Sequence, residues 1–387
     1  MSFGVLFVIV LAGLAGPLLG AGRHVLVPVV VGELLAGLLL GRSGFRWLHP
    51  DQPTFAFLAE IGFAMVMFTA GMNVPLREPA LVRQIRRGAL AAGTAGVLAV
   101  GAGWLVTRLA GLGHPAIYAV VLASGSAAAL VPALEEVGLL DDTTALVVAA
   151  QVAIADVASI VVVPLVLRPH RALHAVLGIA LVAAGCVALL VALRFLHTRG
   201  WIRELRQRSK SRAWALDLRL SLLVLFGLAW ITVRAGVSVL VAGFGVGLVV
   251  AATGGPKRLS RQVTGIAQGF FVPLFFVALG ARIDVREFVH RGSLIELGVL
   301  LVVLNIGIHA VSALVTRQPL AAGLAATVQL GVPAAVVALG LQDRLLSAGA
   351  AAAIMVAALA SLAVSTVGVA MLAARAPRSA TAASAAP

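Results

Sequence analysis

The run TTALVVAAQVAIADVASIVVVPLVL fills residues 143–167 and carries one charged side chain, Asp156, near its middle. A membrane-spanning helix needs about 20 largely apolar residues, and this run supplies them without interruption. The rest of the chain has the same character: 61% of its 387 residues are hydrophobic, 11% are charged, and the mean hydropathy is +1.08. Soluble globular proteins do not have this composition. The sequence therefore predicts an all-α, polytopic membrane protein.

Charges, proline–glycine pairs and basic clusters divide the chain into about 13 candidate transmembrane helices. The predicted spans are residues 3–21, 25–41, 55–76, 88–107, 115–134, 143–167, 172–193, 214–233, 236–252, 263–281, 293–315, 320–341 and 346–374. Basic residues gather in alternate loops, and positive charge is retained in the cytoplasm. We therefore expect a protein of the cell (inner) membrane with its N-terminus outside and its C-terminus in the cytoplasm. The tail at 376–387 is predicted to be disordered, and no soluble domain is expected after the membrane part.

Three short motifs occur twice in the same order. GELLAGLLLG from Gly32 matches AGFGVGLVVA from Ala242, so that Gly37 corresponds to Gly247. FTAG ending at Gly71 matches FVALG ending at Gly280, and Val131-Pro132-Ala133 matches Val332-Pro333-Ala334. Members of each pair lie seven spans apart, an odd number, so the second copy enters the membrane from the opposite side. This predicts an inverted-topology repeat, 3–167 and 214–374, around a linker helix at 172–193. Chance recurrence of small-residue motifs is the alternative.

Pro132 and Pro333 predict interrupted helices in spans five and twelve, because proline lacks the amide donor and clashes with the preceding turn. Ser124-Gly125-Ser126, just before Pro132, is a weak helix stretch, and Pro333 stands in the same way behind Gln329-Leu330-Gly331. Backbone groups freed in a bilayer are tolerated only where they line protein or water, and there they form ion and substrate sites. We therefore expect two broken helices, marked by Pro132, Gly331 and Pro333, beside the functional site. For either helix alone, an ordinary kink is the alternative.

Asp156 is the predicted binding residue for both a monovalent cation and a proton. A charge at the bilayer centre costs about 2.5–3.5 kcal/mol, so a carboxylate at that depth calls for an explanation. A partly desolvated carboxylate can hold either ion but hardly both, and one such site that opens to each side in turn is an exchanger. A structural aspartate bonded to a neighbouring helix is the alternative. The predicted supporting residues are Ser124, Ser126, Ser159, Gln329, Asn305 and His309.

Other polar residues at membrane depth receive weaker assignments. His309 is either a neutral structural imidazole or a counter-charge to Asp156. Glu33 and Glu60 are expected to bond to the backbone or to neighbouring helices, and Glu296 is expected to be solvated. Gln151 is interpreted as a helix contact, and the single cysteine, Cys186, is given no role.

Several of these stretches together resemble the cation/proton antiporter superfamily, on the side of the Kef-like monovalent cation:proton antiporter-2 proteins. They are GELLAGLLLG at 32, FLAEIGFAMVMFTAGMNV at 57, SGSAAALVPALEEVGLL at 124, the Asp156 helix, LVAGFGVGLVV at 240 and FFVPLFFVALGARIDV at 270. The resemblance implies thirteen helices divided between a dimer domain and a core domain. It also implies crossing broken helices, a core carboxylate that binds the ion, and an elevator-like movement of the core within a homodimer.

The chain departs from the family pattern at three places. Many members carry a second acid or a glutamine before the core aspartate, where this chain has Ala155. His309 stands where members often have lysine or arginine, and Gly331-Val332 stands where Gly-Glu is usual. A Kef-type nucleotide-binding tail is not present, so regulation through such a domain is not expected.

The predicted function is secondary active exchange of Na⁺ or K⁺ for H⁺ by alternating access. One carboxylate that swaps one cation for one proton moves no net charge if His309 keeps a fixed state, so the exchange is predicted to be electroneutral. An ion-coupled carrier of an organic solute and a non-transporting sensor or scaffold are the alternatives. No nucleophile–base pair, metal cluster or phosphate loop occurs outside the helices, so neither an enzyme nor a cofactor is predicted. The net charge of +14 lies in short loops, which argues against nucleic acid as a partner.

Overall fold

The computed structural model describes residues 2–20, 29–74, 79–198, 216–234, 238–253 and 257–375. Every regular element within these ranges is a helix, and each of the thirteen predicted spans contains one. Within the same ranges, nine helices are long and apolar enough to cross a membrane, and three shorter apolar helices accompany them. The fold is therefore the predicted all-helical membrane fold, while the count of thirteen crossings stays a prediction. The predicted disordered tail at 376–387 lies outside the described residues.

The chain folds into two sets of helices joined by one long helix. The first part contains α1 (Phe3–Gly13), α2 (Ala15–Gly20), α3 (Val29–Leu40), α4 (Pro53–Met72), α5 (Pro79–Ala110), α6 (Pro115–Ala123), α7 (Ala127–Glu136) and α8 (Thr143–Leu167). The predicted linker is α9 (Ala172–Thr198). The second part contains α11 (Leu216–Arg234), α12 (Val239–Thr253), α13 (Lys257–Ile266), α14 (Val272–Arg282), α15 (Val285–His290), α16 (Gly292–Val315), α17 (Leu320–Ala326), α18 (Gly331–Gln342) and α19 (Ala348–Arg375).

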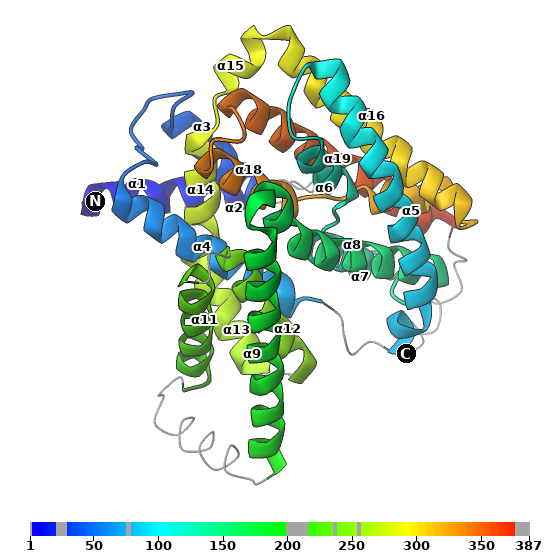
Figure 1. Ribbon diagram of the computed structural model, residues 1–387, viewed down its shortest axis with the longest axis horizontal. Coiled ribbons are helices and arrows are strands. Elements are labelled where there is room, and N and C mark those ends of the chain that lie inside the picture. Colours follow the sequence, from blue (N-terminus) through cyan, green and yellow to red (C-terminus); the bar gives the residue numbers. More distant parts are fainter. Residues whose placement is uncertain are drawn as a thin grey trace, which may run out of the picture.

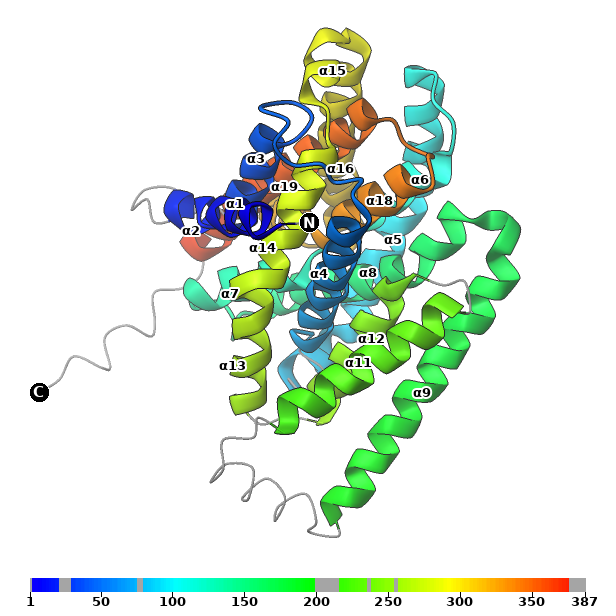
Figure 2. The same cartoon turned by 90° about the vertical axis from the view of Figure 1, so that its left-hand side faces the viewer.

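Helices from both parts of the chain mix in each of two groups. Figure 1 shows α1, α3, α4, α11, α13 and α14 on one side, and α5, α8, α16 and α19 on the other. The helix α9 lies between the groups in Figure 1, and in Figure 2 it runs along one edge of the molecule. Within the first group α3 packs on α14 and α4 packs on α12, and within the second α5 packs on α8 and α17 on α19.

Four glycines make the two closest helix crossings of the first group. On α3 and α14, a Cβ on Gly37 would meet the carbonyl of Val277, and a Cβ on Gly280 would meet that of Leu34. The equivalent glycines of the matched motifs do the same where α4 crosses α12, with Gly71 against the carbonyl of Phe244 and Gly247 against that of Phe68. Small residues let helix backbones approach closely in membranes. An inverted repeat places its equivalent helices in reciprocal pairs of this kind, so the two crossings support the predicted duplication.

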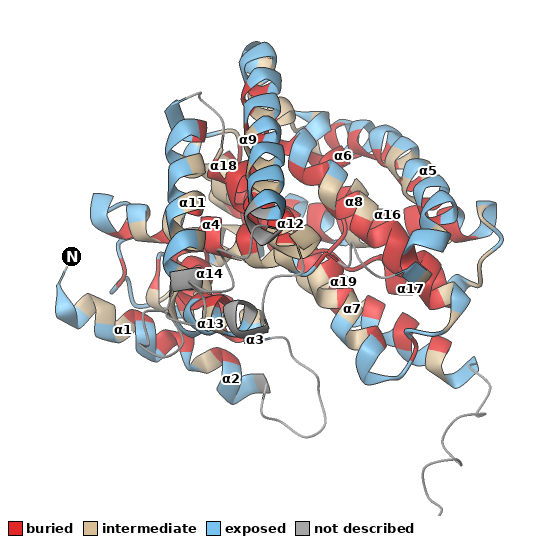
Figure 3. Cartoon of the chain, turned by 90° about the horizontal axis from the view of Figure 1, so that it is seen from below, coloured by how far each residue is buried: buried red, intermediate tan, exposed pale blue. Residues whose placement is uncertain are grey.

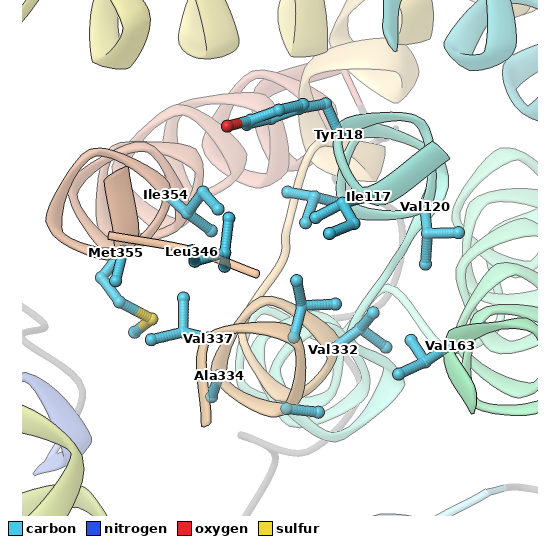
Figure 4. Packing of buried hydrophobic residues seen from close by; sticks show 14 of the residues in the cluster. Ile117, Tyr118, Val120, Val163, Val332, Ala334, Val337, Leu346, Ile354 and Met355 are labelled. Atoms are coloured by element: carbon cyan, nitrogen blue, oxygen red, sulfur yellow. The ribbon is translucent and has the colours of Figure 1, made fainter. Parts of the chain in front are cut away.

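The second group is held by apolar packing around α18. Figure 4 shows Val332 and Val337 of α18 among side chains from α6, α8 and α19, including Ile117 and Ile354. Figure 3 shows that α8 is largely buried, while α9 and α11 are exposed along much of their surface. The exposed side chains of α9 include Leu173, Leu177 and Val187. Apolar surface of this extent is compatible with lipid rather than with water.

The structure corrects the predicted cause of the first helix break. The chain leaves helical geometry at Ser124 to Ser126, and Pro132 lies inside α7. In the second case the break covers Thr327 to Leu330, and Gly331 and Pro333 belong to the first turn of α18. The first turn of a helix does not use the amide that proline lacks, so Pro333 follows the break rather than making it.

Two further helices differ from the predicted spans. α5 begins at Pro79, well before the predicted start at residue 88. No helix breaker follows Pro79 in the segment before residue 88, and the arginines of that segment have side chains long enough to reach the membrane interface. Span ten is one helical rod with a π-helical turn at Ala267–Phe271, just before Pro273. Such turns commonly accommodate a local disruption of the hydrogen-bond ladder.

The glycine crossings can be tested by adding a methyl group. We expect Gly37→Ala and Gly247→Ala each to destabilise the detergent-solubilised protein by about 1–3 kcal/mol, because the Cβ overlaps backbone that cannot rotate away. Gly96→Ala and Gly101→Ala in α5 are matched controls, because a Cβ there meets nothing within 4 Å. The controls should melt at or slightly above the wild-type temperature, since alanine is the better helix former. Equal melting of all four variants would contradict the assigned crossings.

Candidate functional site

Asp156 lies on α8 against the start of a half-helix. Its Oδ2 accepts a hydrogen bond of 3.2 Å from the backbone amide of Ala127, the first residue of α7. The side chain is buried, with 4% of the residue exposed. A helix N-terminus carries partial positive charge, so this amide favours negative charge on the carboxylate. Among the described residues no lysine, arginine or histidine pairs with Asp156, and its Oδ1 makes no hydrogen bond.

The first break brings its backbone directly against the helix of Asp156. A Cβ on Gly125 would stand 2.8 Å from the carbonyl oxygen of Val152, so only glycine fits where the break crosses α8. Ser126 occupies the N-cap of α7, yet its hydroxyl does not cap the helix. Ser124 differs, because its Oγ donates to the carbonyl of Val121 at 2.7 Å. Of the two predicted serines, Ser126 therefore keeps its hydroxyl for another partner.

The second break is held by side chains from α16 and α19. Asn305 Nδ2 donates to the carbonyl of Thr327 at 3.0 Å. Ser361 Oγ accepts from the amide of Gln329 at 3.0 Å. These bonds satisfy backbone groups that the interruption of α17 and α18 would leave without partners.

Gln329 connects the two breaks. Its Nε2 donates to Asn305 Oδ1 at 2.9 Å and to the carbonyl of Leu122, at the end of α6, at 3.4 Å. Leu122 lies just before the first break, and all three residues are buried. The ends of α6, α7 and α18 thus meet beside α8 near the middle of the molecule (Figure 1). The sequence predicted that the two breaks flank one site, and this contact joins them.

His309 takes a structural position. Its Nδ1 lies 2.9 Å from the carbonyl oxygen of Asn305, one turn earlier on α16. A carbonyl only accepts, so Nδ1 carries the proton and the ring needs no charge to make this bond. Among the described residues His309 makes no contact with Asp156 that would pair their charges. The structure therefore does not place His309 as a counter-charge to Asp156.

The remaining predicted polar residues lie in different surroundings. Ser159 is buried one turn after Asp156, and Gln151 is buried on the same helix. Glu33 was expected to bond to the backbone or a neighbouring helix, but its Oε2 is buried without a hydrogen-bond partner. Glu60 carried the same expectation and is instead exposed, because it lines a cavity. Glu296 is exposed, as expected.

The sequence did not predict three features of this site, namely the backbone contact at Gly125 and the participation of Thr327 and Ser361. Their roles are contacts with distant backbone, which a single sequence does not display. The sequence of the last helix did contain an indication, because Ser361 and Ser365 lie four residues apart in an apolar run. In the structure both serines bond to the segment formed by α17 and the break after it. Within the described residues no group of three or more His, Cys, Asp and Glu side chains could hold a resident metal ion.

A helical membrane fold in which two broken helices meet at a buried carboxylate has the design of a secondary transporter. The family model for the transmembrane sodium/hydrogen exchanger matches residues 6–375, and the chain belongs to this family. The predicted superfamily is thereby confirmed, and the protein is a transporter that exchanges monovalent cations for protons, not an enzyme.

Individual relatives are distant but extensive. A Na⁺/H⁺ antiporter of Enterococcus hirae is 24% identical over 268 residues, which cover 68% of each chain. The chloroplastic K⁺ efflux antiporter 2 of Arabidopsis thaliana is 26% identical over 292 residues, 70% of this chain and 24% of that longer protein. The structure of the sodium proton antiporter MjNhaP1 of Methanocaldococcus jannaschii at pH 8 superposes with a TM-score of 0.64 at 16% identity, over 96% of this chain and 98% of that one. This likeness shows a shared fold.

Proposed function

We propose that this protein exchanges Na⁺ or K⁺ for H⁺ by alternating access, with Asp156 holding either ion in turn. One observation carries the proposal: a buried carboxylate bonds to a half-helix amide and has no cationic side chain against it among the described residues. An uncompensated buried charge is costly, so Asp156 needs a proton or a bound cation. Ser126 and the carbonyls beside the breaks supply the oxygen ligands that a small monovalent cation prefers. Relatives named for Na⁺/H⁺ and for K⁺ exchange support both cations.

Electroneutral exchange follows from the surroundings of Asp156. One proton and one monovalent cation carry the same charge, so their exchange at one carboxylate moves no net charge. A second titrating group in the cycle would change this balance. His309 is hydrogen-bonded to its own helix and forms no ion pair with Asp156, which supports a fixed state for its ring.

A large cavity is the proposed outer access route. It has a volume of about 930 Å³ and lies between α4 and α14 on one side and the end of α18 on the other. Its charged lining residues are Arg42, Asp51, Glu60, Arg282 and Arg344. The cavity reaches Ala338, which lies about two helical turns, roughly 10 Å, from the start of α18 beside the second break. With the N-terminus outside, as the loop charges predict, this cavity opens to the exterior.

The two helix groups are proposed to be the two subdomains of an elevator. The glycine crossings make the group of α3, α4, α12 and α14 rigid, and the site lies wholly within the other group. The first group is the proposed dimer domain of a homodimer, which mass photometry in nanodiscs would detect as twice the chain mass. A monomer that transports at full rate would contradict the dimer.

The Asp156 assignment predicts the loss of exchange in one variant. In proteoliposomes, Asp156→Asn should reduce cation-driven proton movement by more than tenfold for Na⁺ and K⁺ alike, because an amide neither binds a proton at neutral pH nor neutralises a cation. Asp141→Asn, in the exposed loop before α8, is the control and should keep wild-type activity. Size-exclusion profiles establish that both variants are folded. Wild-type exchange by Asp156→Asn would refute the assignment.

Electroneutrality predicts that membrane potential has no effect on the rate. In proteoliposomes with one fixed K⁺ gradient, setting the membrane potential by adding valinomycin should leave the initial rate of Na⁺/H⁺ exchange unchanged. A His309→Gln variant with the same flat dependence would show that the ring takes no part in charge movement. A rate that changes severalfold over 100 mV would contradict the proposed stoichiometry, because each unbalanced charge contributes about 2.3 kcal/mol at that potential.

The position of the large cavity can be probed with single cysteines. In a Cys186→Ser background, Ala338→Cys should react with a membrane-impermeant maleimide in right-side-out vesicles and not in inverted ones. Asp141→Cys, at the opposite end of the second helix group, should show the reverse pattern. Labelling of the two positions from the same side would overturn the proposed topology.

A further inference from the structure

A second, smaller cavity lies in the helix group that holds Asp156. It has a volume of about 180 Å³ and is formed where α5, the start of α8 and the turn between α16 and α17 come together. Its lining residues are Arg87, Thr143, Thr144, Val147, Thr316, Arg317, Gln318 and Pro319. Pockets for drug-sized ligands measure about 300–1,000 Å³, so this one suits a smaller group. The proposed topology places it on the cytoplasmic side.

Hydrogen-bond donors dominate the lining. Arg87 and Arg317 make no hydrogen bond or ion pair with any described residue, and the hydroxyls of Thr143 and Thr144 are likewise without partners there. No acidic residue lines the cavity; the nearby Asp142 caps α8 through the amide of Ala145 at 2.9 Å. Two guanidinium groups and two hydroxyls around one small space form a site for an oxyanion, because arginine matches phosphate with paired N–H groups.

The side-chain amide of Gln318 is held in place by its neighbours in the cavity wall. Thr316 gives its hydroxyl proton to the carbonyl of Ser312 at 2.7 Å, so its oxygen accepts from Gln318 Nε2 at 2.9 Å. This arrangement fixes the orientation of the amide and leaves Gln318 Oε1 buried without a hydrogen-bond partner. A buried acceptor without a donor costs free energy. The donors left to meet a ligand are therefore the side chains of Arg87, Arg317, Thr143 and Thr144, and a ligand that completes the site accepts several hydrogen bonds.

We propose that this cavity binds a phosphate group, either inorganic phosphate or the headgroup of a phosphate-monoester lipid. Its oxygens accept from Arg87, Arg317 and the two threonines. The bound group joins α8, which carries Asp156, to the turn that leads into the second broken helix. A group bound here is distinct from the exchanged ions, and its binding does not depend on which residue carries them.

Equilibrium dialysis of the detergent-solubilised full chain with radiolabelled inorganic phosphate tests the proposal. We expect saturable binding, at least tenfold weaker in Arg87→Gln and in Arg317→Gln. Arg86→Gln, one residue away on the same helix, and Arg344→Gln, which like Arg317 has a left-handed backbone (φ 57 against 55), are matched controls and should bind within twofold of wild type.

Competition with short-chain lipids separates the two sources of the phosphate group. If dihexanoyl phosphatidic acid displaces the radiolabelled phosphate at a lower concentration than unlabelled phosphate does, the natural ligand is a lipid headgroup. If unlabelled phosphate displaces it at the lower concentration, the natural ligand is inorganic phosphate. Dihexanoyl phosphatidylcholine, a diester with a bulky cation, should not compete. The proposal is overturned if neither phosphate nor phosphatidic acid binds, or if the control variants lose binding as much as Arg87→Gln and Arg317→Gln do.

Discussion

A backbone amide or carbonyl inside a bilayer must find a partner within the protein, and the structure depends on how this requirement is met at two helix breaks. At the first break the free amide of Ala127 bonds to Asp156. At the second, Asn305 and Ser361 bond to the backbone of Thr327 and Gln329. The groups that stabilise the interrupted helices are thus the polar side chains that surround the site. The stability of the interrupted helices and the geometry of the candidate site rest on the same few contacts.

The sequence predicted much of the fold because composition and spacing are local properties. Apolar runs located the spans, and the repeated motifs selected Gly37, Gly71, Gly247 and Gly280, which the structure places at two reciprocal crossings. Asp156 stood out because a charge at that depth is costly. The predictions that failed were those that depended on contacts between segments far apart in the sequence. Pro132 is tolerated inside α7, and the break falls at the Ser-Gly-Ser segment, where helix propensity is lowest and where Gly125 meets α8.

Side-chain partners were harder to predict than side-chain depth. His309 and Glu33 lie in membrane spans, as expected, but the rotation of each helix about its axis decides what they face. His309 turns toward the carbonyl of Asn305 on its own helix, and Glu33 leaves a buried oxygen without a partner. Glu60 faces a cavity whose existence depends on the separation of α4 from the end of α18. The spacing of residues within a single segment does not determine any of these three side-chain environments.

The glycine crossings also limit where the molecule can change shape. Backbones in direct contact have no side chains between them that could repack, so α3 with α14 and α4 with α12 are unable to slide. Relative movement is left to surfaces where side chains intervene, such as the contact of α4 with the start of α18, where Met67 lies against Gly331. With three rotatable bonds and a polarisable sulfur, methionine adapts to more than one neighbouring surface. The adaptable contacts between the two helix groups are in this way separate from the rigid glycine crossings.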